Sequence, residues 1–163
     1  MIEFRKVILP DEVDVVQEID RRIFASFPGD LFDAEEWNGL ESYWMVEHDE
    51  IVGCSAFIRH VDYDETPREG CLHIVSTGVL PEARGLGLGR KQKEWQIEFA
   101  RREGFHTIVT NMRRSNAQII HLNSELGFEE RKIHPNFYAD PQEDGIVMER
   151  HISPNWSVTN AQE

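Results

Sequence analysis

A glycine-rich segment near the middle of the chain has the residue types that bind anions. It lies between a predicted strand and a predicted helix and reads Val79-Leu80-Pro81-Glu82-Ala83-Arg84-Gly85-Leu86-Gly87-Leu88-Gly89-Arg90. Glycines let backbone amides approach a ligand closely, and the first turn of a helix has unpaired amides with partial positive charge. The basic residues of the same stretch are Arg84, Arg90, Lys91 and Lys93. The segment predicts a phosphate site; the alternative is a turn that only joins strand to helix.

Two common phosphate loops do not fit these residues. A Walker A loop needs Gly-Lys followed by Ser or Thr, which is missing here. A GxGxxG dinucleotide loop counted from Gly85 would need glycine where the chain has Arg90. The pattern that fits is V-x-P followed by R-x-x-G-x-G, formed by Val79, Pro81, Arg84, Gly87 and Gly89.

Hydrophobic periodicity predicts the elements that must position this segment. Strands are expected over residues 3–9, 43–47, 51–61, 71–79, 105–110, 130–133 and 146–152. Helices are expected from residue 11 to about 28, over 33–40, from 88 to 104 and from 115 to 126. The order of strand, glycine turn, helix and strand indicates a mixed α/β domain.

Composition limits the class of protein. The chain has 163 residues, of which 40% are hydrophobic and 29% charged, as in a single folded domain. We expect residues 1–152 to form that domain and 153–163 a polar tail, in which Trp156 could dock. The two cysteines, Cys54 and Cys71, lack a CxxC spacing, so free thiols in a reducing compartment are expected and structural zinc is not.

Charge is distributed unevenly. The net charge of -13 argues against nucleic acid and anionic membrane as partners, because both attract cationic patches. Residues 11–50 hold thirteen acidic side chains against two arginines, whereas residues 84–114 hold eight basic against three acidic. The chain has neither an apolar run of about 18 residues nor a signal peptide, so a cytoplasmic protein is expected.

Two sequence blocks together resemble the GNAT superfamily of N-acetyltransferases. The V-x-P and R-x-x-G-x-G block is similar to the family's acetyl-CoA diphosphate loop. A second block, Asn116 followed by Leu122 and Leu126-Gly127-Phe128, is similar to the family segment N-x-x-A-x-x-L-Y-x-x-x-G-F, and residues 145–150 resemble its last strand. The resemblance covers residues 71–150 and implies a single domain with a mixed, mostly antiparallel sheet flanked by helices.

The resemblance also implies acetyl-CoA as cosubstrate, without a metal. The residues expected to bind it are Thr77, Gly78, Val79, Arg84, Gly85, Leu86, Gly87, Leu88, Gly89, Arg90, Asn116 and Asn123. In the family a bulge splays this strand from the next one, and amides at residues 77–79 face the thioester. Gly78 is suggestive of such an oxyanion donor, but it could also be an ordinary strand glycine.

Acetyl transfer to an amine needs a base, because an alkyl amine is neutral in only about one molecule in 2500 at pH 7. His73 lies on the strand that leads into the glycine turn, where the family often has a Glu or His as water-linked base. Histidine titrates near neutral pH, which suits this role. The alternative is a strand histidine packed against its neighbours.

The proton donor to the leaving thiolate is open. The family's usual Tyr, four residues before the Gly-Phe pair, is replaced by Asn123, whose amide can hydrogen-bond a thiolate but cannot protonate it. Tyr138, water or no general acid could take this part. Tyr138 is placed in the loop before the final strand, where it lines the acceptor site or fills a hydrophobic gap.

An amine acceptor is expected, either a small molecule or a peptide N-terminus. Candidate acceptor residues are the acidic Asp33 and Glu36 and the aromatic Phe27 and Trp37, which could otherwise be a solvated helix face and core. The main alternative function is a non-catalytic acyl-CoA-binding regulatory module. A nucleotide- or phosphometabolite-binding α/β domain is the second, and a homodimer is compatible with the resemblance.

Overall fold

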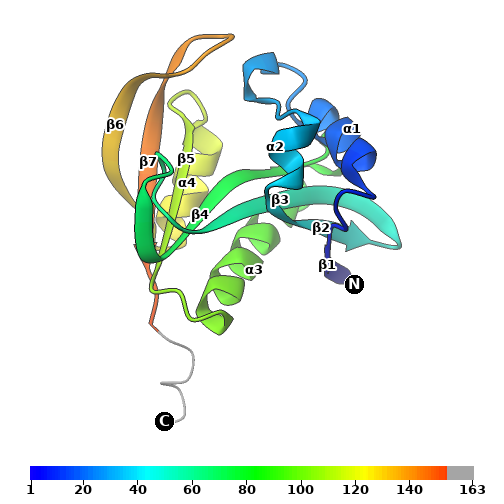
Figure 1. Ribbon diagram of the computed structural model, residues 1–163, viewed down its shortest axis with the longest axis horizontal. Coiled ribbons are helices and arrows are strands. Elements are labelled where there is room, and N and C mark those ends of the chain that lie inside the picture. Colours follow the sequence, from blue (N-terminus) through cyan, green and yellow to red (C-terminus); the bar gives the residue numbers. More distant parts are fainter. Residues whose placement is uncertain (154–163) are drawn as a thin grey trace, which may run out of the picture.

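Seven strands form one sheet in the order β1-β2-β3-β4-β5-β7-β6 in the computed structural model, which describes residues 1–153 (Figure 1). The strands are β1 (Ile2–Lys6), β2 (Glu41–Glu47), β3 (Glu50–Val61), β4 (Pro67–Val79), β5 (Thr107–Arg113), β6 (Glu129–Tyr138) and β7 (Glu143–His151). Only β4 and β5 pair in parallel, and the other neighbours are antiparallel. The predicted mixed, mostly antiparallel sheet is confirmed.

Helices cover both faces of this sheet. They are α1 (Val13–Ile23), α2 (Ala34–Asn38), α3 (Leu88–Arg102) and α4 (Ala117–Glu125), with short 3-10 turns η1 (Pro28–Asp30) and η2 (Pro81–Ala83). One hydrophobic cluster joins α1 and α2 to Trp44 of β2, and another joins Leu88 of α3 to its neighbour Met45. Because adjacent strand residues point to opposite faces, α1 and α2 lie on one face and α3 on the other. The largest cluster places α4 on the α3 face, through Ile119 and Ile120.

The predicted end of the first helix and the predicted last hairpin are wrong. The first helix ends at Ile23 and not near residue 28, because Pro28 disfavours helical geometry at Phe27 and the Asp20 carboxylate draws the chain back by accepting from Phe32 N at 3.1 Å. The last hairpin is longer than expected, and Tyr138 is the final residue of β6 instead of a loop residue. Strand β6 lies at the sheet edge with mostly exposed side chains, so it has little apolar signal.

The sheet is split next to the glycine turn. Strand β4 pairs with β5 only from Cys71 to Ile74, whereas its pairing with β3 continues to Val79. Val75 is an extra residue in the β3–β4 ladder, since Ile74 and Ser76 face the consecutive residues Phe57 and Ala56. Such a bulge bends the strand, and the ends of β4 and β5 therefore separate. This is the bulge that the resemblance implies.

The expected tail, Trp156 included, lies outside the described residues from residue 154 on. Among residues 1–153, no helix is long and apolar enough to cross a bilayer. Cys54 and Cys71 are both free and buried.

Candidate active site

The glycine turn opens α3 with a backbone that other residues adopt only under strain. Gly85 and Gly87 have φ of +83° and +77°, and a Cβ on either one would meet open space. Glycine is required at these two positions by conformation and not by packing. Leu88 anchors the turn at 3% exposure, while Leu86 is 67% exposed. The turn therefore presents the free amides at the start of a helix of 15 residues to solvent.

The basic residues of this stretch do not all face the turn. Arg84 Nε donates to Val79 O at 3.0 Å and its Nη2 donates to Ile23 O at 2.9 Å, so this side chain ties the end of β4 to the end of α1. Arg90 pairs with Glu125 of α4, and Lys91 is exposed. Lys93, which the sequence groups with the exposed cations, is only 1% exposed. That grouping is wrong for Lys93.

Two glutamines of α3 hold the split end of β4. Gln92 Nε2 donates to Gly78 O at 3.2 Å and Gln96 Nε2 donates to Thr77 Oγ1 at 3.0 Å. A Cβ on Gly78 would lie 2.4 Å from Cγ2 of Ile23, so glycine lets α1 approach the strand closely. Close packing is therefore a structural reason for a glycine at position 78, in addition to the predicted oxyanion role. Residues 75–79 are half-buried and have no β5 partner.

His73 and Tyr138 are joined through Asn111, a residue that the sequence analysis missed. His73 Nε2 lies 3.0 Å from Asn111 Oδ1, and Asn111 Nδ2 donates to the Tyr138 hydroxyl at 2.9 Å. Because the amide oxygen can only accept, the network assigns the proton to Nε2 and leaves the lone pair on Nδ1. That nitrogen is buried without a hydrogen-bond partner among residues 1–153. The sequence carried little signal for Asn111, because the strand predicted over residues 105–110 ends just before it.

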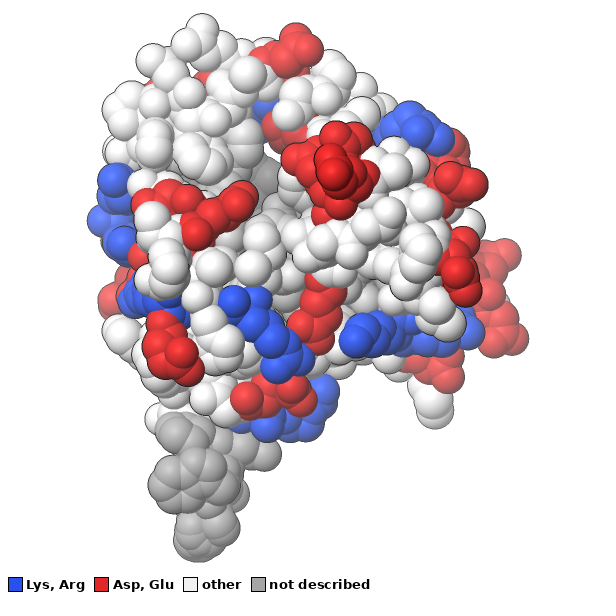
Figure 2. Space-filling model, in the orientation of Figure 1, with Lys and Arg blue, Asp and Glu red and all other residues white. Residues whose placement is uncertain are grey.

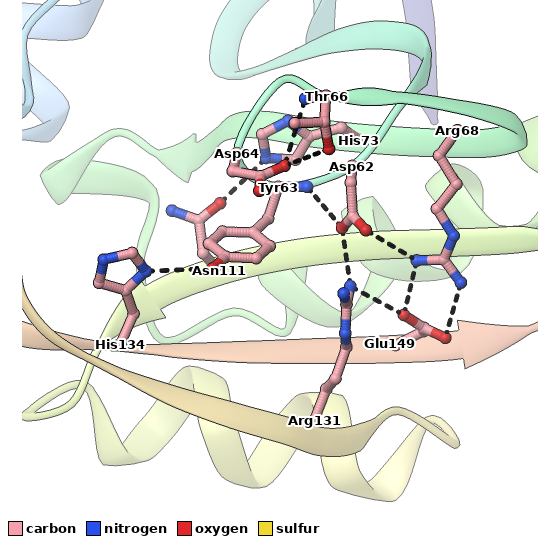
Figure 3. A network of polar contacts seen from close by, with 10 residues as sticks. All are labelled: Asp62, Tyr63, Asp64, Thr66, Arg68, His73, Asn111, Arg131, His134 and Glu149. Atoms are coloured by element: carbon pink, nitrogen blue, oxygen red, sulfur yellow. Dashed lines mark hydrogen bonds and ion pairs between the residues drawn. The ribbon is translucent and has the colours of Figure 1, made fainter.

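The loop between β3 and β4 covers His73, as Figure 3 shows. Two ion pairs hold this loop in place. Asp62 accepts from Arg131 at 2.7 Å. Arg68, at the start of β4, donates to both oxygens of Glu149 at 2.8 and 3.0 Å. Tyr63 adds a contact of 3.1 Å between its hydroxyl and His134 Nδ1.

Burial lowers the pKa of His73, while its bond to Asn111 and the carboxylates of this loop act in the opposite direction. A lowered pKa keeps the imidazole neutral at neutral pH, which is the form that can accept a proton. Burial also raises the pKa of Tyr138, so its hydroxyl stays protonated and is a weak acid.

Arg113 closes the end of the site that lies toward η1. Its guanidinium lies 4.6 Å from the ring centroid of Phe27 and 4.8 Å from that of Tyr138. It also donates to both oxygens of Asp30, at 3.0 and 2.8 Å, and to the backbone of the β6–β7 turn. Phe27 and Tyr138, both predicted for the acceptor region, are thereby brought together.

The other predicted acceptor residues lie elsewhere or are already engaged. Trp37 is 1% exposed and belongs to the core between α1, α2 and the sheet, so its assignment to the acceptor is wrong. Asp33 and Glu36 cap α2 reciprocally: each carboxylate accepts from the other residue's amide, at 2.7 and 2.9 Å. These two carboxylates stabilise the helix start.

The two asparagines of the second block lie in different environments. Asn116 is the exposed N-cap of α4, and its side chain accepts from Ile119 N at 3.2 Å. Asn123 is 0% exposed, and its Nδ2 lies 3.9 Å from the sulfur of Met148. A cofactor does not reach Asn123 from solvent in this conformation, because core side chains enclose its amide.

Figure 2 shows the surface hollowed between the side of β6 and β7 and the side of α1 and α2, with acidic side chains on both rims. The site thus combines an anion-binding helix start, a split in the sheet beside it and a neutral histidine near that split. This combination defines a class: an α/β domain that holds an extended, phosphate-bearing ligand against a proton acceptor.

Residues 13–128 match the acetyltransferase (GNAT) family, and the chain belongs to that family. The ribosomal protein bS18-alanine N-acetyltransferase of Escherichia coli (strain K12) is 37% identical over 82 residues, which are 49% of this chain and 55% of that relative. The match therefore spans about half the length of that relative. An uncharacterized N-acetyltransferase of Methanocaldococcus jannaschii is 29% identical over 141 residues, 84% of each chain.

A solved structure shares the fold along nearly the whole chain. The crystal structure of the ribosomal-protein-S18-alanine N-acetyltransferase from Escherichia coli has a TM-score of 0.77 at 22% identity. The aligned part covers 94% of this chain and 95% of that one.

Proposed function

We propose that the protein transfers the acetyl group of acetyl-CoA to a primary amine. One observation carries the proposal: the glycine turn that opens α3 lies at the end of β4, beside the split from β5, and His73 lies on that same strand. Three features therefore lie one after another along β4: a site for an anion, a gap that can hold an extended ligand, and a neutral base. The family membership supports the same chemistry.

The cofactor would bind by its diphosphate at the turn. Amides of residues 85–90 are the donors, and Lys91 and Arg90 add positive charge at the surface. Arg84 would act by holding the turn against Val79 and Ile23, since its donors are already engaged there. Asn116, exposed at the start of α4, would contact the arm from the other side.

The pantetheine arm would then enter the split and place the thioester at its closed end. The backbone of residues 77–79 has no β5 partner, so amides there are candidates for the oxyanion that forms on the carbonyl. Gln92 and Gln96 fix this backbone from the α3 side. Fixed donors of this kind stabilise developing charge without reorganisation.

Chemistry begins with loss of a proton from the acceptor ammonium, directly or through one water, to Nδ1 of His73. The amine nitrogen then forms a bond to the thioester carbon, the C–S bond breaks and its electron pair leaves on sulfur, and the nitrogen loses its second proton to the thiolate or to solvent. Asn111 keeps the proton on Nε2 of His73 and so keeps the lone pair at Nδ1. The Tyr138 hydroxyl, which accepts from Asn111, retains its own proton to donate to an acceptor oxygen.

The acceptor we favour is the amino group of a peptide N-terminus. Two observations support a peptide over a small polyamine. The carboxylates that could attract a polyamine, Asp30, Asp33 and Glu36, are engaged by Arg113 or by the α2 cap. The similar E. coli protein carries the name of a ribosomal-protein alanine acetyltransferase.

Release of CoA thiol, followed with a panel of amines, tests this function. The panel should contain peptides that begin with Ala, Ser or Met, the same peptides with a blocked N-terminus, and spermidine. We expect thiol release with free peptide N-termini and mass gain of one acetyl group on the peptide. Binding of acetyl-CoA without turnover of any amine would instead support the regulatory module.

A further inference from the structure

Arg84, the arginine of the R-x-x-G-x-G block, binds two backbone carbonyls that are distant in the chain. Its Nε donates to Val79 O at 3.0 Å, and its Nη2 donates to Ile23 O at 2.9 Å. Val79 is the last residue of β4, and Ile23 is the last residue of α1. Because the donors of a guanidinium are fixed in one plane, a side chain that spans two carbonyls holds both segments in one geometry. Arg84 therefore joins the cofactor segment to α1.

The carbonyl of Ile23 lies in the last turn of α1, where a helix has acceptors to spare. The last four carbonyls of an α-helix have no partner within the helix, and a cation near them also interacts favourably with the helix dipole. At Phe24, the residue after Ile23, the backbone has already left helical geometry, with φ of -110° and ψ of 39°. Arg84 thus caps α1 from another segment and holds the point where the chain leaves the helix.

Two further contacts fasten the same junction. Ile23 packs on Gly78 so closely that a Cβ at position 78 would lie 2.4 Å from its Cγ2. Arg22 pairs with Glu82 of η2, two residues before Arg84. The end of α1 is therefore held against both the end of β4 and the segment that leads into the glycine turn.

The chain that leaves this junction is the connection from α1 to α2, residues 24–33, which we call the acceptor loop. Its first turns are local: Phe27 N donates to Phe24 O and Asp30 N donates to Phe27 O, both at 2.9 Å. At the other side of the loop, Arg113 lies 4.6 Å from the Phe27 ring and donates to both oxygens of Asp30. The acceptor loop is thus held by Arg84 where it begins and by Arg113 further along.

The acceptor loop is on the same face of the sheet as His73. Leu72 and Ile74 of β4 pack in the cluster on the α3–α4 face, so His73 between them points to the face of α1 and α2. Phe27, which is predicted for the acceptor region, is carried by this loop. The place of the loop relative to β4 therefore sets where an acceptor can lie relative to the base.

We propose that Arg84 is a positioning residue for the acceptor amine, an inference that rests on the acetyl transfer proposed above. Through Ile23 O it fixes the start of the acceptor loop against the strand that carries His73 and the split. The resemblance implies a different role, in which Arg84 binds the cofactor. That role is left to the amides of the glycine turn and to Arg90 and Lys91, whose positions on α3 are exposed or half-buried.

The test compares the wild type with Arg84→Met, which keeps the apolar stem and removes the guanidinium. We expect the acceptor KM to rise about tenfold, as for loss of two hydrogen bonds that fix a loop, with the KM of acetyl-CoA within about twofold of wild type. The matched variant is Arg90→Met, in the same segment but paired with Glu125 of α4. It should give the opposite result, a higher KM for acetyl-CoA and an unchanged KM for the acceptor.

A second variant, Arg84→Lys, keeps the positive charge but lacks the planar group that spans two carbonyls. We expect it to raise the acceptor KM as well and to keep the KM of acetyl-CoA. Thermal unfolding of the same samples checks folding, and if Arg84→Met is unfolded, the result with Arg84→Lys decides.

An acceptor KM that rises no more than the KM of acetyl-CoA overturns the inference and leaves acetyl transfer standing. A rise in the KM of acetyl-CoA alone, restored in Arg84→Lys, would assign the arginine to the diphosphate instead. Absence of thiol release by the wild type with every amine overturns the proposed function and this inference together.

Discussion

His73 Nε2 and Asn111 Oδ1 lie 3.0 Å apart, in adjacent parallel strands at the place where those strands begin to separate. The contact determines which imidazole nitrogen has the lone pair, and it couples the histidine to Tyr138 through a single amide. A side chain that fixes the tautomer of a base acts on the reaction without touching the reacting atoms. The predictions below separate these contributions.

Replacing His73 by Phe should lower kcat by about 100-fold or more, because the volume is kept and the proton acceptor is lost. The wild-type kcat should fall on the acid side only as pH drops through the pKa of His73, which burial lowers below 6.5. The measurement is kcat against pH for both proteins. His121→Phe, on an α4 side chain that is 75% exposed, is the control. An identical acid limb in His73→Phe would remove His73 from the mechanism.

Asn111→Asp should move the acid limb of kcat to higher pH. A carboxylate beside Nε2 stabilises the protonated imidazole, so the pKa of His73 rises and the neutral base is lost at a higher pH. Asn111→Leu should instead lower kcat without moving the limb upward. If both variants gave the wild-type profile, the His73–Asn111 contact would have no part in catalysis.

Gly87→Ala should weaken acetyl-CoA binding and cost about 1 kcal/mol of stability, because its φ of +77° is strained for any residue with a Cβ. Gly89 is two residues further along in α3 and lacks a positive φ, so Gly89→Ala should keep or raise the unfolding free energy. Chemical denaturation and the KM of acetyl-CoA give the two readouts. Equal stability losses for the two variants would contradict this assignment of the turn.

Arg113→Met should destabilise the fold by about 3 kcal/mol, since it leaves Asp30 and Glu143 without their buried partner. It should also raise the acceptor KM more than that of acetyl-CoA, because Phe27 and Tyr138 lose the group between them. Arg114→Met is the matched control, with a side chain that is 58% exposed. Acceptor KM values that agree between the two variants would exclude Arg113 from the acceptor side.

Replacing the buried Lys93 by Met should stabilise the protein by an amount that depends on pH. The pKa of Lys93 is about 7 in the folded protein against 10.5 in a free lysine, so the unfolded chain binds more protons between these values. Lys93 therefore costs no stability above about pH 10.5, where it is neutral in both states. The destabilisation from its burial grows as the pH falls and is complete below about pH 7. Lys93→Met should stabilise the protein more at pH 6 than at pH 10. A gain that does not vary with pH would mean that the pKa of Lys93 is the same in the folded and the unfolded chain.

Local sequence patterns predicted the elements and the glycine turn well, because both depend on residues close in the chain. The turn needs positive φ at Gly85 and Gly87, and glycine is the residue that adopts it without strain. The predicted ends of elements were wrong where contacts with distant segments determine them. Arg84, 61 residues further on, binds the end of α1 at Ile23 O, in addition to the contact between Asp20 and Phe32 N.

Side-chain partners were the least predictable part of the site. Asn111 and Arg113 bind groups 26 to 83 residues away, and their sequence neighbours do not show these contacts. Burial was misjudged at Lys93, which the sequence grouped with the cations of the helix start, and at Trp37, which was a candidate for the acceptor; both lie in the core. Counting charges along the sequence does not distinguish a buried position of α3 from a solvated one. Lys93 is such a buried position, and its Nζ has no hydrogen-bond partner among residues 1–153.

The central claim is that amides of the glycine turn hold the diphosphate of CoA, and calorimetric titration tests it most directly. Wild-type protein should bind CoA and dephospho-CoA with saturable heat, because both contain the diphosphate. Pantetheine, which lacks it, should give no heat at the same millimolar concentration, and Gly87→Ala should bind CoA more weakly than wild type. No heat and no thermal shift with CoA, or equal binding of pantetheine and CoA, would contradict the account.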